Sequence, residues 1–282
     1  TKMAAAIVDA SGRIRDRAQV VTPRTEDAEV VFAAVLEVVR RVLANSSDAP
    51  VVCGVGCGGP MHANGVEVSP LHIPAWRGFP LRDRLREVVG VDVLIDNDAK
   101  AVAVGEGWVG AARGRDAFIG MVVSTGIGGG IVLDGRLLAG HSGNAGHIGH
   151  VVVEPDGRPC FCGGRGCLEA EASGRAIEEI TGRPAGEATA EIVHRTGTLV
   201  GRAVASAANL LDLPLAVVAG SVALGFGDQF FRAAQAELDA RARLSFSAAT
   251  RIVPAALGAD APLLGAAALG WRGHGGIVGI VV

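Results

Sequence analysis

The chain has 282 residues, a formal net charge of -3 and 49% hydrophobic residues. This near-neutral charge gives no reason to expect a nucleic-acid partner or an anionic membrane surface, and no apolar run is long and clean enough to span a bilayer. Because the sequence shows no signal peptide and has only five cysteines, three of them clustered, the expected location is a reducing cytoplasm.

Strands and helices are expected to alternate along the chain, which predicts an α/β fold. In the first part, hydrophobic patterns predict strands over residues 4–9, 51–55 and 91–95, and helices over residues 81–89 and 98–108. Gly90 is expected to end the first of these helices. An earlier helix is expected to have Thr25 as its cap, with an apolar stripe formed by Val31, Val35, Val38 and Val42.

The second part of the chain continues the same alternation. Strands are predicted over residues 118–123 and 215–219, and Asp134-Gly135 predicts a two-residue hairpin turn. Helices are predicted over residues 170–180, 191–211, 226–241 and 262–270. Since the sequence shows no repeat and no low-complexity linker, we expect any domain boundary at a compact hinge near residues 105–110.

Four residues near the middle of the chain, His150, Cys160, Cys162 and Cys167, indicate one zinc site. Zinc binds four nitrogen or sulfur ligands tetrahedrally, and three cysteines with one histidine are among its structural ligand sets. The glycines at 163–166 let the chain fold back, so that the last two cysteines can reach one ion. The alternative is a reactive or disulfide-forming cluster, although Cys160 and Cys162 are too close for an easy disulfide.

Asn97-Asp98 lies where a buried strand is expected to give way to a helix. In open α/β sheets, ligands bind beyond the carboxyl ends of the strands, and an aspartate there can accept a proton from a substrate hydroxyl. Asparagine and aspartate are also common helix caps, so both interpretations remain open.

The glycine-rich segment at 125–130 follows a second apolar strand. Backbone N–H groups in such turns can form an anion-binding nest. The alternative is a glycine-rich hairpin, because strand and turn residues continue after it. A P-loop is excluded, since no Gly-Lys-Ser/Thr sequence follows and no helix is expected to open there.

Taken together, these segments resemble the ROK family of bacterial ATP-dependent sugar kinases, which includes glucokinases and N-acetylmannosamine kinases. The segments that carry the resemblance are Asn97-Asp98-Ala99, residues 124–130, residues 143–150, the sequence CFCGGRGCLE at 160–169, and residues 217–223. The resemblance implies an actin-like (ribonuclease-H-like) two-lobed α/β fold with ATP and sugar in a cleft. It gives a small lobe over 1–107, to which 262–282 returns, and a large lobe over 108–261.

The resemblance also implies roles for individual residues. Asp98 would deprotonate the 6-hydroxyl of a hexose in a glucokinase-like phosphorylation by ATP. The sugar would be bound by Asn97, His147, His150 and Glu169, with His150 also binding the structural zinc ion. Mg²⁺ would accompany ATP. The residues expected to contact ATP are Thr1, Lys2, Thr125, Gly126, Gly128, Gly220 and Ser221. A homodimer or homotetramer is the assembly that the family implies.

The sequence departs from the family pattern at several positions. His147 stands where most members have a glutamate, and a neutral imidazole offers one donor and one acceptor where a carboxylate only accepts. This difference makes an N-acylmannosamine an alternative substrate to glucose. Lys100 replaces the usual asparagine and is expected to be an ordinary solvated or ion-paired side chain.

The two ends of the given sequence also depart from that pattern. The family begins with a strand followed by DxGGTK, whereas this sequence begins at Thr1-Lys2 and ends with an apolar segment at 275–282. We expect that segment to occupy the first-strand position beside residues 4–9, the alternative being a strand packed elsewhere. If the acid and glycines of DxGGTK are truly absent, the polypeptide is expected to bind ATP poorly.

Two non-catalytic functions remain as alternatives. ROK-type repressors share the kinase lobes but carry an added winged helix-turn-helix, and no such segment precedes Ala4 in the given sequence. A sugar-binding protein with a disabled phosphate loop is the second. An acetate-kinase or heat-shock-type ATPase of the same fold class is disfavoured by the cysteine segment.

Overall fold

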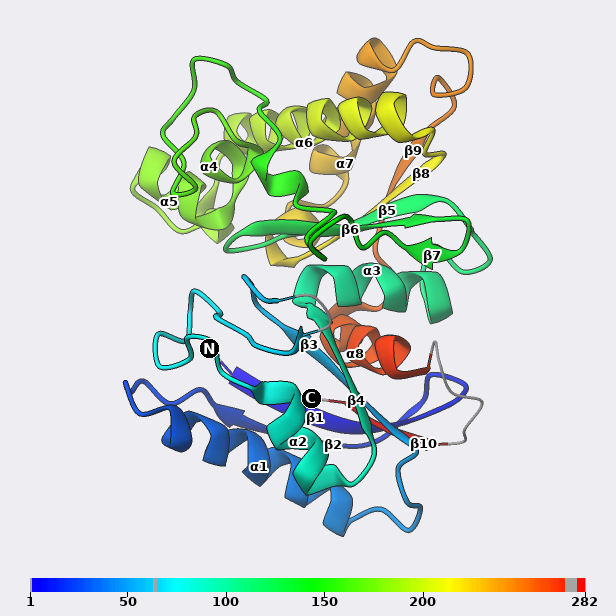
Figure 1. The fold of residues 1–282 in the computed structure, drawn as a ribbon. Helices are drawn as coiled ribbons and strands as arrows, with labels where there is room; N and C mark the ends of the chain where they lie inside the picture. The colour runs from blue at the N-terminus through cyan, green and yellow to red at the C-terminus, as the bar shows by residue number, and fades with distance from the viewer. Residues whose placement is uncertain (1, 63–64, 272–277, 282) are drawn as a thin grey trace. The chain divides into compact units, whose positions relative to one another are not determined.

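The computed structural model describes residues 2–62, 65–271 and 278–281. Internal contacts divide the chain into two compact units. Unit 1 comprises Thr1–Val109, Ala139–Asn144 and Ala259–Val282, and unit 2 comprises Gly110–Leu138 and Ala145–Gly258. Each unit is built on one five-stranded sheet (Figure 1). Within the described residues, no helix is both long and apolar enough to cross a membrane.

The sheet of unit 1 has the strand order β2-β1-β10-β3-β4. Its strands are β1 (Lys2–Asp9), β2 (Ile14–Val21), β3 (Val52–Cys57), β4 (Asp92–Asn97) and β10 (Val278–Val281). β10 runs antiparallel to β1 and parallel to β3. It therefore lies beside residues 4–9, in the position that the sequence analysis gave to the terminal strand. Residues 275–277 and 282 of that segment lie outside the described residues.

Helices cover both faces of this sheet (Figure 1). They are α1 (Ala28–Ala44), α2 (Leu81–Val89), α3 (Asp98–Val109) and α8 (Ala261–Trp271). α1 and α2 share one core with residues of β1, β3 and β4. On the other face α8 lies directly on the sheet, because a Cβ atom at Gly54 would be only 1.8 Å from Ala266 O.

α1 and α2 illustrate how the sequence sets these elements. The four predicted stripe valines of α1 are all buried. The predicted cap is wrong by two residues: Asp27 is the N-cap and accepts a hydrogen bond from Glu29 N, while Thr25 Oγ1 accepts one from Asp27 N. Both residue types cap helices, and here the aspartate is the one next to the first turn. α2 ends at Gly90 as predicted, with φ at 71°.

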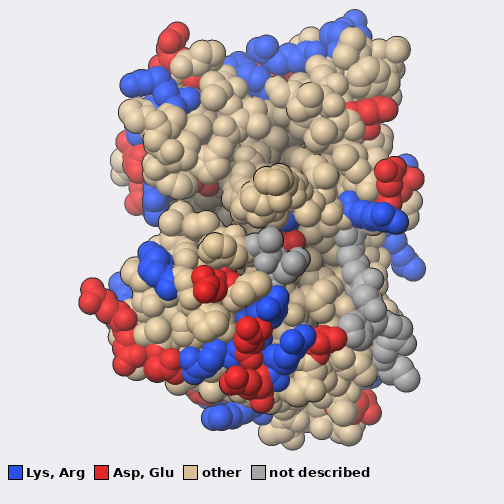
Figure 2. All heavy atoms as spheres, viewed as in Figure 1, with Lys and Arg blue, Asp and Glu red and all other residues tan. Residues whose placement is uncertain are grey.

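Charged side chains on unit 1 are mixed in sign. Figure 2 shows acidic and basic side chains interspersed on the face in view. Arg84 of α2 binds both carboxylate oxygens of Glu29 on α1 at 2.8 Å, and Arg41 pairs with Glu37 one turn away.

The sheet of unit 2 has the order β7-β6-β5-β8-β9. Its strands are β5 (Phe118–Val123), β6 (Ile127–Leu133), β7 (Arg136–Leu137), β8 (Leu215–Ala219) and β9 (Arg251–Pro254). Its helices are α4 (Leu168–Ala172), α5 (Gly174–Thr181), α6 (Ala190–Leu211) and α7 (Ser221–Arg241), with short 3-10 turns η2 (Ile148–His150) and η3 (Ala185–Glu187). The predicted turn between β6 and β7 is confirmed, with positive φ at Asp134 and Gly135.

Among the described residues, several elements differ from the sequence prediction, and α7 also begins five residues before the helix predicted over 226–241. The helix expected over 170–180 is two helices, because Ser173 is extended and its hydroxyl accepts a hydrogen bond from Ala176 N to cap α5. β2 and β9 were not predicted. β2 alternates exposed and half-buried residues and includes three charged ones, so it lacks the continuous apolar run that marks a buried strand.

Candidate functional site

Asn97 and Asp98 lie at the carboxyl end of β4 and the start of α3, in unit 1. Asn97 Oδ1 accepts hydrogen bonds from Ala99 N at 3.0 Å and Lys100 N at 3.4 Å, so it caps the helix. Asp98 Oδ1 also accepts from Ala99 N, at 2.8 Å. Asp98 is exposed, and within the described residues its Oδ2 accepts no hydrogen bond. Both interpretations of this strand end therefore hold: the two side chains cap the helix, and Asp98 still has one carboxylate oxygen available.

Lys100 is buried behind these two residues, with only 2% of its surface exposed. Its Nζ lies 3.1 Å from Asp96 Oδ1 and donates a hydrogen bond to Gly143 O at 2.8 Å. The side chain is thus ion-paired as expected, but it is not solvated. Its bond to Gly143 fastens residues 139–144 to α3 within unit 1.

The glycine-rich segment of unit 2 is the hairpin between β5 and β6, with residues 124–126 as its turn. Two carbonyl groups of this turn are held by the start of α5: Gly174 N donates to Ser124 O at 2.7 Å, and Arg175 N donates to Thr125 O at 3.2 Å. Thr125 and Gly126 remain exposed. The hairpin interpretation is therefore correct for the backbone, and it leaves the tip of the turn accessible.

The start of α7 lies against the same turn. The hydroxyl oxygens of Ser221 and Ser124 are 3.0 Å apart. Gly220 has φ at 100°, and a Cβ atom there would be 2.2 Å from Val123 O, so the chain can pass this closely only with glycine. The first amides of α7 therefore lie next to the exposed turn, and unpaired amides at a helix start can face an anion, although the first segment of α7 is short because the helix is kinked at Gly227.

The histidine segment packs on β6. A Cβ atom at Gly149 would be 2.2 Å from Ile127 O, and one at Gly146 would be 2.7 Å from Gly129 O. These close approaches bring His147 and His150 beside the hairpin, with ring centroids 6.1 Å apart. His147 is exposed, and His150 is half-buried in η2.

His150 and the three clustered cysteines fit a tetrahedral zinc ion. Their ligand atoms all lie within 4.8 Å of one another. Cys160 Sγ is 3.7 Å from His150 Nδ1, and Cys162 Sγ is 3.7 Å from Cys167 Sγ. A tetrahedron with Zn–S bonds of about 2.3 Å has edges of about 3.8 Å, close to both distances. The donor set is therefore arranged for zinc, with His150 turning Nδ1 toward the other ligands.

The thiols of this cluster differ in acidity. Desolvation, together with hydrogen bonds to Cys160 and Cys162, raises the pKa of Cys167 to about 12. A backbone hydrogen bond from Gly164 is the main cause that lowers the pKa of exposed Cys162. Zinc binds thiolates, so metal binding here must displace protons and weakens as the pH falls.

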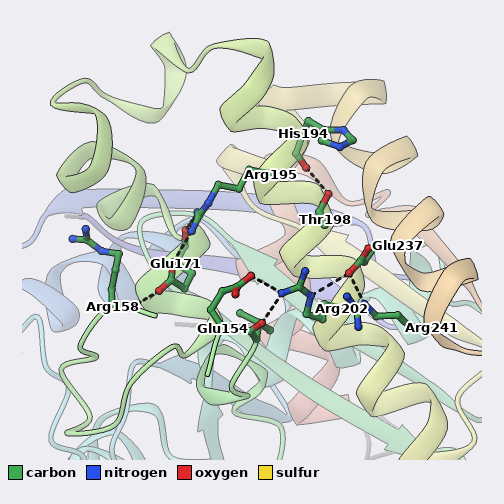
Figure 3. Close-up of polar contacts among 10 residues, drawn as sticks. Glu154, Arg158, Glu171, His194, Arg195, Thr198, Arg202, Glu237 and Arg241 are labelled. Atoms are coloured by element: carbon green, nitrogen blue, oxygen red, sulfur yellow. Dashed lines mark hydrogen bonds and ion pairs between the residues drawn. The ribbon is translucent and has the colours of Figure 1, made fainter. Parts of the chain in front are cut away.

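Two arginines of α6 hold the loop that carries the cysteines (Figure 3). Arg202 Nη1 donates to Val153 O at 2.7 Å and to Glu154 Oε1 at 2.5 Å, before the first cysteine. Arg195 Nη2 donates to Glu171 Oε2 at 2.6 Å, after the last cysteine. The two ends of the loop are thus fixed to one helix independently of any metal.

Glu171 is buried and also holds the segment before the first cysteine. The buried carboxylate accepts a hydrogen bond from Arg158 N at 2.5 Å through its other oxygen, as Figure 3 shows. Sequence reasoning missed these anchors. The available signal was the seven-residue spacing of Arg195 and Arg202, which puts both on one face of a helix.

The predicted site residues therefore belong to both units. Unit 2 brings together Thr125, Gly126, Ser221, Glu169 and the four metal-ligand candidates, and Gly128 lies in β6 opposite Val122. Asn97 and Asp98 belong to unit 1, as does Lys2, an exposed residue at the start of β1. Thr1 lies outside the described residues.

Comparisons with known proteins agree with this picture. Residues 1–272 match the ROK family. A glucokinase from Thermotoga maritima is 39% identical over 181 residues, which cover 64% of this chain but only 56% of that enzyme. An N-acetylmannosamine kinase from Escherichia fergusonii is 33% identical over 243 residues, covering 80% of this chain and 82% of the relative.

A solved structure of a ROK hexokinase from Thermus thermophilus is similar over 97% of this chain and 99% of its own, with a TM-score of 0.81 at 33% identity. The two α/β units and this likeness define the actin-like fold of sugar kinases, which confirms the predicted fold class. The chain belongs to the ROK family.

Proposed function

We propose that the chain transfers a phosphoryl group from ATP to the 6-hydroxyl of a hexose. The observation that carries this proposal is the exposed Asp98, which keeps one carboxylate oxygen available at the end of a parallel strand. A carboxylate in this position can take the hydroxyl proton as the phosphoryl group is transferred. Relatives over most of the chain that are named as sugar kinases give independent support.

The proposed roles of the other residues follow from their chemistry. Asn97, His147, His150 and Glu169 bind sugar hydroxyls, and the accessible turn at 124–126 with the start of α7 receives the ATP phosphates. Mg²⁺ bound with ATP supplies charge neutralisation at the phosphate oxygens. The protein's own contribution is alignment, which can lower a barrier by about 7–11 kcal/mol. Structural zinc on His150 and the cysteines would fix the sugar-binding histidine in one orientation.

Glucose, or a broad hexose preference, is the proposed substrate, and an N-acylmannosamine is the alternative. His147 is the observation that favours the alternative, because it replaces a carboxylate with a group that can donate a hydrogen bond to an acyl carbonyl. Relatives of both names have comparable identity to this chain. We also propose a homodimer or homotetramer, which analytical ultracentrifugation would test.

The decisive experiment is ADP release with Mg-ATP, using glucose, mannose and N-acetylmannosamine in parallel. Asp98→Asn is expected to lower kcat by about 10²–10⁴-fold while sugar affinity stays nearly unchanged. Asp83→Asn, which removes an exposed carboxylate from α2, is the matched control and is expected to keep full activity.

Two outcomes would contradict the proposal. Undiminished turnover by Asp98→Asn would remove this residue from the chemistry. Sugar binding without ADP formation for every sugar would favour the non-catalytic sugar-binding alternative.

A further inference from the structure

Glu169 makes a contact that a sugar ligand does not require. Its Oε2 accepts a hydrogen bond from Ile127 N at 2.6 Å, which joins the first turn of α4 to the residue directly after the 124–126 turn. The two residues are 42 positions apart, and both belong to unit 2. Hydrogen bonds from an N–H group to a carboxylate are among the stronger ones in proteins.

The carboxylate also fills the space beside the turn. A Cβ atom at Gly126 would lie 2.9 Å from the same Glu169 Oε2, which is closer than Cβ atoms pack. Gly126 does not have a positive φ, so its backbone alone would accept alanine. Glycine at this position is therefore explained by the approach of Glu169.

Other contacts also hold the turn, but they bind different residues of it. The start of α5 holds the carbonyls of residues 124 and 125, and Ser221 contacts Ser124. All of these act on the first half of the turn. Among the described residues, Glu169 supplies the side-chain hydrogen bond to its second half, where Gly126 and Ile127 pass into β6.

We propose that Glu169 is a positioning residue for the phosphate-binding turn as well as a sugar ligand, a proposal that rests on the proposed function. One carboxylate oxygen holds Ile127 N, and the other, Oε1, faces the sugar hydroxyl. Sugar binding and nucleotide binding are then coupled through one side chain, and linkage makes the effect reciprocal: if bound sugar raises the affinity for nucleotide, bound nucleotide raises the affinity for sugar by the same factor.

Nucleotide affinity in the absence of sugar separates this role from that of a simple sugar ligand. The probe is the non-hydrolysable ATP analogue AMP-PNP with Mg²⁺, titrated calorimetrically into the full chain. Glu169→Ala is expected to weaken binding about tenfold, the effect of losing one charge-assisted hydrogen bond. Glu169→Gln keeps an acceptor oxygen for Ile127 N and is expected to stay within about twofold of wild type.

Glu178→Ala, which removes an exposed carboxylate from neighbouring α5, is the matched control and is expected to bind like wild type. Wild-type affinity in Glu169→Ala would overturn the proposal. Equal losses in the alanine and glutamine variants would also overturn it, because they would indicate a general effect of charge.

Amide hydrogen exchange provides a readout that needs no ligand. The peptide containing Ile127 is expected to exchange faster in Glu169→Ala, while the Gly174 amide, anchored on Ser124 O, keeps its protection and reports an intact fold. Gly126→Ala displaces the carboxylate from the other side. The double variant is therefore expected to exchange no faster than either single variant, and additive effects would contradict the shared bond.

These measurements distinguish the two proposals. If no sugar is phosphorylated but exchange at Ile127 still depends on Glu169, the proposed function fails and the positioning role stands. If sugar is phosphorylated while AMP-PNP affinity is independent of Glu169, the positioning role fails and the function stands.

Discussion

At the scale of single residues, Asp9 shows how local hydrogen bonds set the acidity of a buried carboxylate. It ends β1 and is 93% buried. Desolvation by itself would raise its pKa, but hydrogen bonds from the Ser11 hydroxyl at 2.6 Å, from Arg13 N at 3.1 Å and from Arg15 Nε at 2.8 Å outweigh it. The net effect lowers the pKa from 3.8 to about 2.

Asp9→Asn is therefore expected to lower the free energy of unfolding at pH 7 by about 2 kcal/mol. Since the folded-state pKa lies below the unfolded value, the stabilisation is present above pH 3.8 and is lost as the pH falls through 2. Urea unfolding at pH 7 and pH 3 measures this difference, which should be smaller at pH 3. Asp48→Asn, at an exposed position, is the control. A pH-independent difference would contradict this account.

At the scale of elements, two faces of α6 make different contacts. One face carries Arg195 and Arg202, whose hydrogen bonds hold the cysteine loop. The other packs on α7, where Cβ atoms at Gly197 and Gly201 would lie 2.5 Å from Phe230 O and 2.2 Å from Ala234 O. The helix thus joins the metal-ligand loop to the centre of unit 2.

Gly201→Ala is expected to destabilise the protein by about 2 kcal/mol, because the added methyl group meets a backbone carbonyl that cannot move alone. Gly225→Ala in α7 is the matched control. No atom lies within 4 Å of its Cβ position, so this change is expected to stabilise the helix by about 0.5–1 kcal/mol. Thermal unfolding of both variants, followed by circular dichroism, checks the opposite signs. Equal effects would show that the α6–α7 contact is not the cause.

Sequence predictions succeeded where the signal is local. The stripe of α1, the glycine stop of α2 and the spacing of Cys160, Cys162 and Cys167 each depend on neighbouring residues. Contacts between distant segments were missed where no sequence pattern or resemblance marks them. Neither the bond from Ile127 to Glu169 nor the anchoring of the loop by Arg202 has a local pattern, since both join segments more than 40 residues apart.

At the scale of the whole molecule, the alternation of strands and helices predicted the fold class, whereas the grouping of residues 139–144 was not predicted. Residues 139–144, which the sequence analysis gave to the large lobe, cluster with unit 1. The hydrogen bond from buried Lys100 to Gly143 O is one contact that holds this segment to unit 1. All three tryptophans, Trp76, Trp108 and Trp271, also fall in unit 1, whereas the metal-ligand candidates are in unit 2.

The proposed zinc ion would lie in unit 2 alone, so its removal is expected to be a selective perturbation. A chelator is expected to produce a transition in circular dichroism, which reports the helices of both units, at a temperature lower by roughly 5 °C or more, while the Tm from tryptophan emission stays nearly unchanged. Cys167→Ser should have the same effect. Cys53→Ala, in the buried β3 of unit 1, should instead lower the tryptophan Tm. A parallel fall in both signals after chelation would mean that the two units unfold together.

The position of β10 also bears on how the sheet of unit 1 closes during folding. This strand lies in the middle of its sheet, between β1 and β3. Its pairing with these two strands joins segments that are far apart along the chain, so the loop-closure entropy must be overcome before the sheet is complete. Until β10 is in place, β1 and β3 each present an open strand edge, and a chaperone that shields such edges would act there.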